Sequence, residues 1–210
     1  VLDSVAASGG PAGRRLLEAL GCDLVHLHGE PLGVFPHTPE PTEANLTELA
    51  EVVAKDSGAT VGFAQDPDAD RLAVIDENGR YIGEEWTLVL TGLRMMQRGG
   101  GGPIAANLST SRMIDDVCKG FEGASVVRTA VGEANVVQGI RSSGGAIGGE
   151  GNGGVIIPEV CLIRDSLSAM ALILELLATD QRPLSAIVDA LPRYSMLKRK
   201  WDLSSVGGKE

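Results

Sequence analysis

The residues best suited to chemistry form an acidic loop in the first half of the chain. Asp66, Asp68 and Asp70 alternate along it and Arg71 follows at once, directly after the apolar, strand-like residues 60–65. Carboxylates on alternate residues can converge on one cation and supply the hard oxygen ligands that Mg²⁺ or Ca²⁺ takes. A neighbouring arginine suits a bound phosphate, because phosphate oxygens can accept from a guanidinium while they ligate a metal. We therefore predict a divalent-cation site here.

Parts of this acidic loop also fit a solvated turn or an EF-hand. In a solvated turn, Arg71 would form a plain salt bridge to one aspartate. An EF-hand loop also begins with alternating aspartates, and Glu77 falls at its twelfth position. However, the sixth position, which requires glycine, is Arg71, and the flanking residues alternate like strands. We reject the EF-hand and keep the solvated turn as the alternative.

A second candidate site is the glycine-rich segment 148–154. It follows a predicted strand and precedes an apolar run rather than a helix, and it has neither the Lys nor the Ser/Thr of a P-loop, so it is not a nucleotide-binding turn. It presents Glu150 and Asn152 where a strand ends, which is where ligands of open α/β sheets bind. A carboxylate and an amide suit sugar hydroxyls as acceptor and donor. A flexible turn with two solvated polar residues is the alternative.

Two further turns carry weaker signals. Gly132 and Glu133 stand at a predicted helix start, where backbone N–H groups can bind an anion, although ordinary entry into a helix accounts for them more simply. The small residues 8–13 are expected to allow close packing of a strand on a helix rather than to bind a ligand.

The elements that must position these residues alternate along the chain. Strand-like segments are expected at 1–5, 23–28, 60–65, 71–76, 80–83, 103–108, 125–130, 145–150 and 154–158. Helical segments are expected at 14–21, 42–56, 84–98, 110–121, 133–143, 166–179 and 183–192. The pattern restarts near residue 83, so we predict an α/β fold of two consecutive three-layer α/β/α domains, with mixed, mostly parallel sheets. The domains are residues 1–83 and 84–192, and residues 193–205 are expected to leave the second domain as a strand.

Composition agrees with this class and excludes others. Glycine makes up 28 of the 210 residues and aromatic residues only 3%, which suits an aliphatic core with tight turns. The net charge of −10 argues against a protein that tracks nucleic-acid phosphates. The longest apolar run, residues 169–178, contains Glu175 and is too short for a bilayer. We therefore expect neither a nucleic-acid partner nor a membrane partner.

Cys22, Cys118 and Cys161 are odd in number and lie in apolar runs. This is typical of reduced thiols packed in the core of a cytoplasmic protein. The histidines lie together in another segment, at His26, His28 and His37. Because the cysteine spacings are wide and the histidines stand apart from them, we expect no zinc site.

The order of three motifs resembles the α-D-phosphohexomutase family, which includes phosphoglucomutase, phosphomannomutase and phosphoglucosamine mutase. The motifs are the aspartate triplet with its arginine (66–71), a Thr-x-Val-Gly helix start (129–132) and a Gly-Glu-x-x-Gly loop (149–153). The resemblance covers essentially all 210 residues. They look like the family's second, metal-binding domain and third, sugar-binding domain, with residues 193–210 as a linker entering a fourth.

The resemblance implies roles for the acidic loop. Asp66, Asp68 and Asp70 would hold Mg²⁺ together with a phosphoserine oxygen, and Arg71 would position that phosphoryl group as a catalytic residue. Family members transfer phosphate from the phosphoserine to a hexose phosphate. The resulting bisphosphate then returns its other phosphate, so that hexose 1-phosphate and hexose 6-phosphate interconvert.

The resemblance also implies a substrate site. Glu150 and Asn152 would contact sugar hydroxyls, with Gly132 and Glu133 lining the same cleft. Many members have Ser where this chain has Asn152, and the variant looks like archaeal-type enzymes, so the choice among glucose, mannose and glucosamine phosphates stays open. Pro67 and Ala69 replace family glycines, but neither position supplies a ligand side chain.

The family's phosphoserine loop and its C-terminal phosphate-binding loop belong to the first and fourth domains and have no equivalent here. We therefore expect the remaining domains of the same, longer chain to be the partners, and the 210 residues alone to be inactive. The alternative is a stand-alone divalent-cation or sugar-phosphate binding module. A different phosphotransferase is disfavoured, because no Ser–His or Cys–His arrangement is visible.

Overall fold

A computed structural model describes residues 1–56, 58–99 and 102–194. In the first half of the chain the elements are β1 (Leu2–Asp3), α1 (Gly10–Ala19), β2 (His26–Leu27), the 3₁₀ turn η1 (Glu43–Asn45), α2 (Thr47–Lys55), β3 (Val61–Gln65) and β4 (Leu72–Asp76). In the second half they are α3 (Glu85–Gln97), β5 (Pro103–Asn107), α4 (Met113–Lys119), β6 (Ser125–Thr129), α5 (Glu133–Ser143), β7 (Ile147–Gly149), β8 (Val155–Ile156), α6 (Ser166–Asp180) and α7 (Leu184–Asp189).

The described strands form two sheets built on the same plan. The first has the order β2-β1-β3-β4 and the second the order β6-β5-β7-β8. In each sheet the first three strands are parallel and the last is antiparallel. The predicted class, two α/β/α domains with mixed, mostly parallel sheets, is confirmed.

The two antiparallel edge strands meet and link the sheets. Arg71, just before β4, forms an isolated antiparallel bridge with Gly154, just before β8. Next to it the backbone N–H of Leu72 donates to the carbonyl of Gly153 at 3.1 Å. These contacts place the acidic loop, at the start of β4, directly beside the glycine-rich loop that precedes β8.

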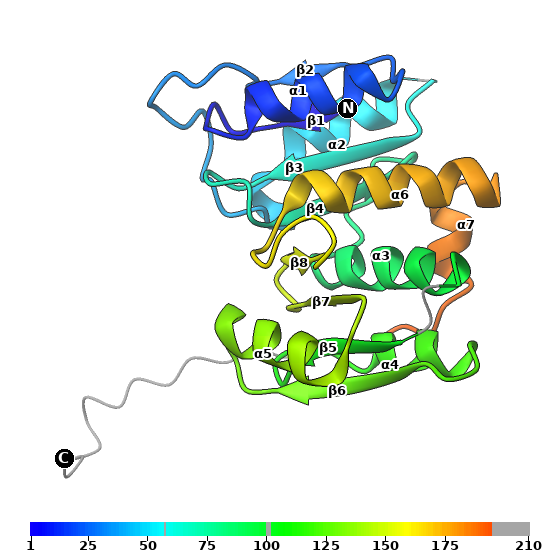
Figure 1. The fold of residues 1–210 in the computed structure, drawn as a ribbon. Coiled ribbons are helices and arrows are strands. Elements are labelled where there is room, and N and C mark those ends of the chain that lie inside the picture. Colours follow the sequence, from blue (N-terminus) through cyan, green and yellow to red (C-terminus); the bar gives the residue numbers. More distant parts are fainter. Residues whose placement is uncertain (57, 100–101, 195–210) are drawn as a thin grey trace, which may run out of the picture.

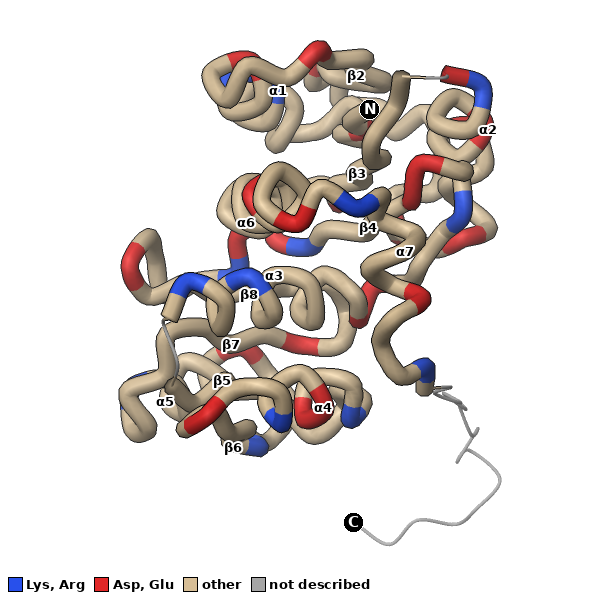
Figure 2. The backbone as a smooth tube through the Cα atoms, turned by 90° about the vertical axis from the view of Figure 1, so that its right-hand side faces the viewer, with Lys and Arg blue, Asp and Glu red and all other residues tan. Residues whose placement is uncertain are grey.

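The largest apolar cluster of the described residues spans both sheets, and two smaller clusters lie under α2 and α5. Helix α6 lies between the first sheet and α3 and packs against both α1 and α3 (Figures 1 and 2). Its fully buried Ile173 belongs to one cluster with Phe63 of the first sheet, Leu88 of α3 and Ile104 of the second sheet. The strands divide into two sheets near residue 83, but the main apolar cluster continues across that point. The domain boundaries at residues 83 and 192 therefore stay a prediction.

Local chemistry explains where the main helices begin. Asp165 caps α6, because its carboxylate accepts from the backbone N–H groups of Leu167 and Ser168 at 3.0 and 3.1 Å. Helix α1 begins at Gly10, four residues earlier than predicted, with a proline in its first turn. The expectation that residues 8–13 form only a turn was therefore wrong. Their role in close packing of a strand on a helix was right, because a Cβ on Gly13 would lie 2.8 Å from the side chain of Leu2 in β1.

Several strands are shorter than predicted. Only Leu2 and Asp3 of residues 1–5 pair, because the chain turns at Val5 and Ala6, which have φ of 47° and 53°. The predicted strand at 80–83 forms one bridge, between Ile75 and Tyr81. The strand expected at 193–205 lies, apart from its first two residues, outside the described part of the chain.

Of the three cysteines, only Cys118 is buried, whereas Cys22 and Cys161 are partly exposed. Cys22 nevertheless packs against the main apolar cluster, so the expectation that all three pack in the core was wrong only for Cys161. Among the described residues, none of the helices combines the length and the apolar character that crossing a bilayer requires.

Candidate functional site

The acidic loop brings its three carboxylates together at the carboxyl end of β3. Ligand oxygens of Asp66, Asp68 and Asp70 all lie within 4.8 Å of one another. Asp66 is buried, Asp70 is partly buried and Asp68 is exposed. The loop turns back at Ala69, which adopts a left-handed φ of 59° and donates its N–H to the carbonyl of Asp66 at 3.0 Å. Glycine adopts this conformation without strain, so alanine is tolerated here at a cost of about 1 kcal/mol.

Arg71 folds back onto this loop. Its backbone N–H and its Nε donate to the two carboxylate oxygens of Asp66 at 3.0 and 2.6 Å. One terminal nitrogen also donates to Glu40 at 2.8 Å. Burial lowers the pKa of Arg71, but these hydrogen bonds to Glu40 and Asp66 outweigh it and keep the pKa above its ordinary value. The plain salt bridge to an aspartate, expected for Arg71 in a solvated turn, is thus present in the structure.

Crowding of charge shows most clearly at Asp70. Burial first, and then the neighbouring charge of Asp66, raise its pKa from 3.8 to about 6, although Arg164 opposes the shift. A cation placed among the three carboxylates would relieve this repulsion. Oxygen donors of this kind and number fit Mg²⁺.

The glycine-rich loop presents its acid inward. Glu150 is buried at the end of β7. One of its oxygens accepts from the side chain of Asn107 at 2.6 Å and from the backbone of Gly132 at 3.2 Å, and the other accepts from Arg164 at 3.1 Å. The side-chain oxygen of Asn152 accepts from the backbone of Gly154 at 3.2 Å and so closes its own turn.

Arg164 is a site residue that the sequence pattern did not predict. Its guanidinium contacts Asp70 of the acidic loop, Glu133 at 3.0 Å and Glu150 at 3.1 Å. Three carboxylates that lie far apart in sequence therefore share one cation. The only local signal was an arginine directly before the capping residue Asp165 of a predicted helix.

The helix start at Gly132 joins the same network. Gly132 has φ of 116° and precedes α5, and its N–H points at Glu150. Glu133, the first residue of α5, accepts from Arg164. The structure thus connects Gly132, Glu133, Glu150 and the acidic loop through Arg164, and it places Asn152 on the turn that bridges to β4.

A hollow of about 270 Å³ opens beside the acidic loop. Asp68, Ala69 and Arg164 line it together with the small residues Ser8 and Gly9. Of the three acidic-loop carboxylates only Asp68 lines this hollow, and part of its wall is apolar. Fold and site together define an α/β protein of two sheets. In it an acidic loop with the oxygen donors of a cation site contacts the glycine-rich loop.

Comparison with protein families agrees with this architecture. Residues 1–79 match the model described as phosphoglucomutase/phosphomannomutase, alpha/beta/alpha domain II. Residues 84–194 match the model described as alpha/beta/alpha domain III of the same family. The chain therefore belongs to the phosphoglucomutase/phosphomannomutase family, as its motifs predicted.

Individual relatives agree. A protein of Thermococcus kodakarensis named phosphoglucomutase/phosphomannomutase is 41% identical over 95% of this chain and 44% of its own length. A protein of Methanosarcina barkeri named "Probable phosphoglucosamine mutase" is 37% identical over 93% of this chain and 44% of its own. The crystal structure of a phosphoglucomutase/phosphomannomutase family protein from Burkholderia thailandensis superposes with a TM-score of 0.82, is 30% identical, and is matched over 91% of this chain and 42% of its own. The chain thus spans less than half the length of these relatives.

Proposed function

We propose that these residues form the metal- and sugar-binding centre of a phosphohexomutase, an isomerase that interconverts hexose 1-phosphate and hexose 6-phosphate through a phosphoserine and a hexose bisphosphate. The names of the relatives support this class. The observation that carries the proposal is the Arg164 network, because it joins the acidic loop to the glycine-rich loop in one site.

In this proposal Asp66, Asp68 and Asp70 hold Mg²⁺, which when bound neutralises charge on a transferring phosphoryl group. Arg71, anchored on Asp66 and Glu40, is the catalytic residue that positions that group. The anchoring limits the rotamers of the guanidinium, so less conformational freedom is lost when a phosphate binds.

Glu150 and Asn152 contact the sugar hydroxyls, and Gly132 and Glu133 line the cleft. Because Glu150 is already engaged by protein donors, a sugar hydroxyl must share or replace one of them. The Asn107 side chain is buried and held by Ser109 and Thr110, whereas Arg164 is partly exposed and is the movable donor. The Gly132 N–H is backbone at a helix start and cannot swing away. Arg164 therefore holds the Glu150 carboxylate in place until substrate binds.

The partners in this proposal are a hexose phosphate and the remaining domains of a longer chain, which supply the phosphoserine. Neither nucleic acid nor membrane is a partner, and the protein acts in the cytoplasm. The 210 residues alone do not isomerise hexose phosphates, since they lack the nucleophile.

The experiment is Mg²⁺ binding to the 210-residue chain by calorimetry, with Asp68→Ala as the test variant. Asp68 is the exposed member of the triplet, so its removal leaves the fold intact while Mg²⁺ affinity falls by about tenfold or more through loss of one charged ligand. Asp23→Ala, at an exposed aspartate before β2, is the matched control and leaves affinity unchanged. Equal affinity of the Asp68→Ala and unaltered chains would make the triplet a solvated turn.

A further inference from the structure

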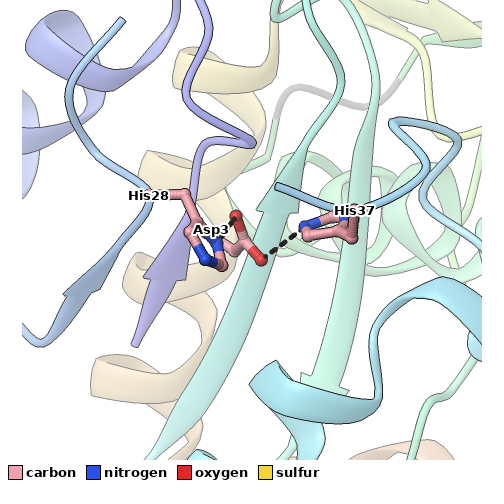
Figure 3. Close-up of side chains that lie close together, drawn as sticks. All are labelled: Asp3, His28 and His37. Atoms are coloured by element: carbon pink, nitrogen blue, oxygen red, sulfur yellow. Dashed lines mark hydrogen bonds and ion pairs between the residues drawn. The ribbon is translucent and has the colours of Figure 1, made fainter. Parts of the chain in front are cut away.

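The side chains of Asp3, His28 and His37 converge at the carboxyl ends of β1 and β2 in the first sheet, outside the site described above. Asp3 ends β1, His28 follows β2, and His37 lies on the proline-rich segment 29–41. Both imidazoles point at the Asp3 carboxylate (Figure 3). His28 Nδ1 lies 3.2 Å from one of its oxygens and His37 Nε2 lies 3.0 Å from the other.

The carboxylate in this cluster is buried and held in place. Asp3 is 2% exposed. One of its oxygens also accepts the backbone N–H of Val5 at 2.9 Å. A buried carboxylate requires a compensating positive charge, because its own hydration is lost.

The hydrogen bonds of His37 leave a place for a cation. Its Nδ1 lies 2.9 Å from the carbonyl oxygen of Thr38, which can only accept, so Nδ1 carries a proton. In the neutral ring, Nε2 then has a lone pair directed at an oxygen of Asp3. Two electron pairs face each other across 3.0 Å unless a proton or a metal ion lies between them.

His28 has the same arrangement. Its Nδ1 faces Asp3 and its Nε2 lies 3.6 Å from a carboxylate oxygen of Glu48. A neutral imidazole can donate to only one of these acceptors. All ring nitrogens of His28 and His37 therefore face acceptors, whereas a neutral imidazole carries a proton on only one of its two nitrogens.

We propose that Asp3, His28 and His37 form a second metal site, which takes Zn²⁺ or a similar transition-metal ion. Two imidazoles and a carboxylate suit these ions, whereas Mg²⁺ prefers oxygen alone. Ligand atoms about 2.0–2.1 Å from a tetrahedral zinc lie roughly 3.3 Å apart. Each imidazole nitrogen lies at about this distance from its own oxygen of Asp3, 3.2 Å for His28 and 3.0 Å for His37, and one ligand atom from each residue lies within 4.8 Å of the others. A carboxylate that binds through both oxygens therefore places one ion between the two rings. A ligating histidine also commonly donates its second N–H to a backbone carbonyl, as His37 does.

The site fastens the proline-rich segment to the sheet. That segment, residues 29–41, follows His28 and contains both His37 and Glu40, and Glu40 accepts from Arg71 of the acidic loop. Metal bound at His28 and His37 holds the start of the segment and a point close to Glu40, which supports Arg71. The sequence predicted no zinc site because the cysteines are widely spaced and lie apart from the histidines, but this cluster uses no cysteine.

The test is titration of the 210-residue chain with Zn²⁺ by calorimetry and with Co²⁺ by visible absorption, in excess Mg²⁺ so that the acidic loop is occupied. We expect one ion per chain and a visible absorption spectrum typical of Co²⁺ in tetrahedral coordination. His37→Ala and His28→Ala each weaken Zn²⁺ binding by about 100-fold or more. His26→Gln is the matched control and leaves binding unchanged, because His26 bonds Ser4 instead.

A second readout is proteolysis after Leu32, an exposed residue of the same segment that is followed by glycine. Zn²⁺ should slow chymotrypsin cleavage there in the unaltered chain and not in His37→Ala. Zn²⁺ binding no tighter than millimolar, or binding equal in both histidine variants and the unaltered chain, would overturn the proposal and leave protonated imidazoles as the partners of Asp3. Asp68→Ala keeps its Zn²⁺ affinity, so this test succeeds or fails independently of the Mg²⁺ site.

Discussion

Individual residues of the acidic loop determine how it responds to protons. Asp70 has a pKa of about 6 because it is partly buried beside Asp66. A carboxyl group must lose its proton before it can ligate a metal. The folded chain also binds this proton more tightly than the unfolded chain, whose pKa is 3.8. The group therefore stabilises the metal-free fold increasingly as pH falls from 7 towards 4.

Magnesium affinity should accordingly depend on pH. We expect it to be constant above pH 7 and to fall by about tenfold per pH unit below pH 6, as Asp70 becomes protonated. Calorimetric titrations of the 210-residue chain from pH 8 to pH 5 measure this. Asp70→Asn, which has no proton to lose, should bind weakly and with little pH dependence in that range. An affinity of the unaltered chain that stays flat to pH 5 would contradict the shift.

Arg164 is a second single residue with a large expected effect, because its guanidinium contacts the carboxylates of Asp70, Glu133 and Glu150. Arg164→Ala leaves the buried Glu150 without its cation, so the free energy of unfolding should fall by about 2–4 kcal/mol. Urea denaturation measures this loss. Arg164→Lys retains the charge but not the forked donors, so we expect an intermediate value. A loss as large for lysine as for alanine would contradict this, because it would mean that the retained charge contributes nothing and that the forked donors carry the whole effect.

At the scale of elements, the contact between the two sheets depends on a glycine. Gly153 has φ of 91°, and a Cβ there would lie 2.5 Å from the carbonyl oxygen of Leu72. This close approach allows the hydrogen bond from Leu72 to Gly153. The glycine-rich loop is thus shaped for packing on β4.

Gly153→Ala should therefore destabilise the chain by about 2–4 kcal/mol, through backbone strain and this clash together. Gly144→Ala is the matched control. Gly144 also has a left-handed φ, of 68°, but a Cβ there meets nothing within 4 Å. The control should lose only about 1 kcal/mol, the cost of the backbone conformation alone. Equal losses in thermal denaturation of the two variants would show that the sheets do not need this close contact.

At the scale of the whole molecule, the two sheets share a core. Helix α6 follows the second sheet in sequence but packs beside the first sheet and α3. Neither half can unfold without exposing apolar surface of the other, because the buried cluster includes Phe63, Ile173 and Ile104. Cooperative unfolding is the expected consequence.

We expect one thermal transition, with equal calorimetric and van't Hoff enthalpies. Ile173→Ala in α6 removes a fully buried side chain and should cost about 2–5 kcal/mol while the single transition is retained. Val160→Ala, at an exposed position, is the control and should change stability little. Two resolved transitions in differential scanning calorimetry would contradict the shared core.

Much of this organisation could be predicted from the sequence, because it depends on local signals. Apolar periodicity and turn residues located the elements, and for α5 the predicted bounds 133–143 agree with the structure. The spacing of Asp66, Asp68 and Asp70 predicted their convergence, since a tight turn after a strand brings alternate side chains together. The ends of short strands were less predictable, because pairing there depends on the neighbouring strand.

Only the tertiary structure decided which distant residues meet. The contacts of Arg164 with Asp70 and Glu133, and of His28 and His37 with Asp3, join segments that carry no mutual pattern in sequence. No local pattern in the sequence indicates the position of α6 beside the first sheet either. Local sequence determines backbone conformation through short-range sterics and hydrogen bonds, whereas the choice of partners across the chain comes from burying one common core, which only the folded arrangement specifies.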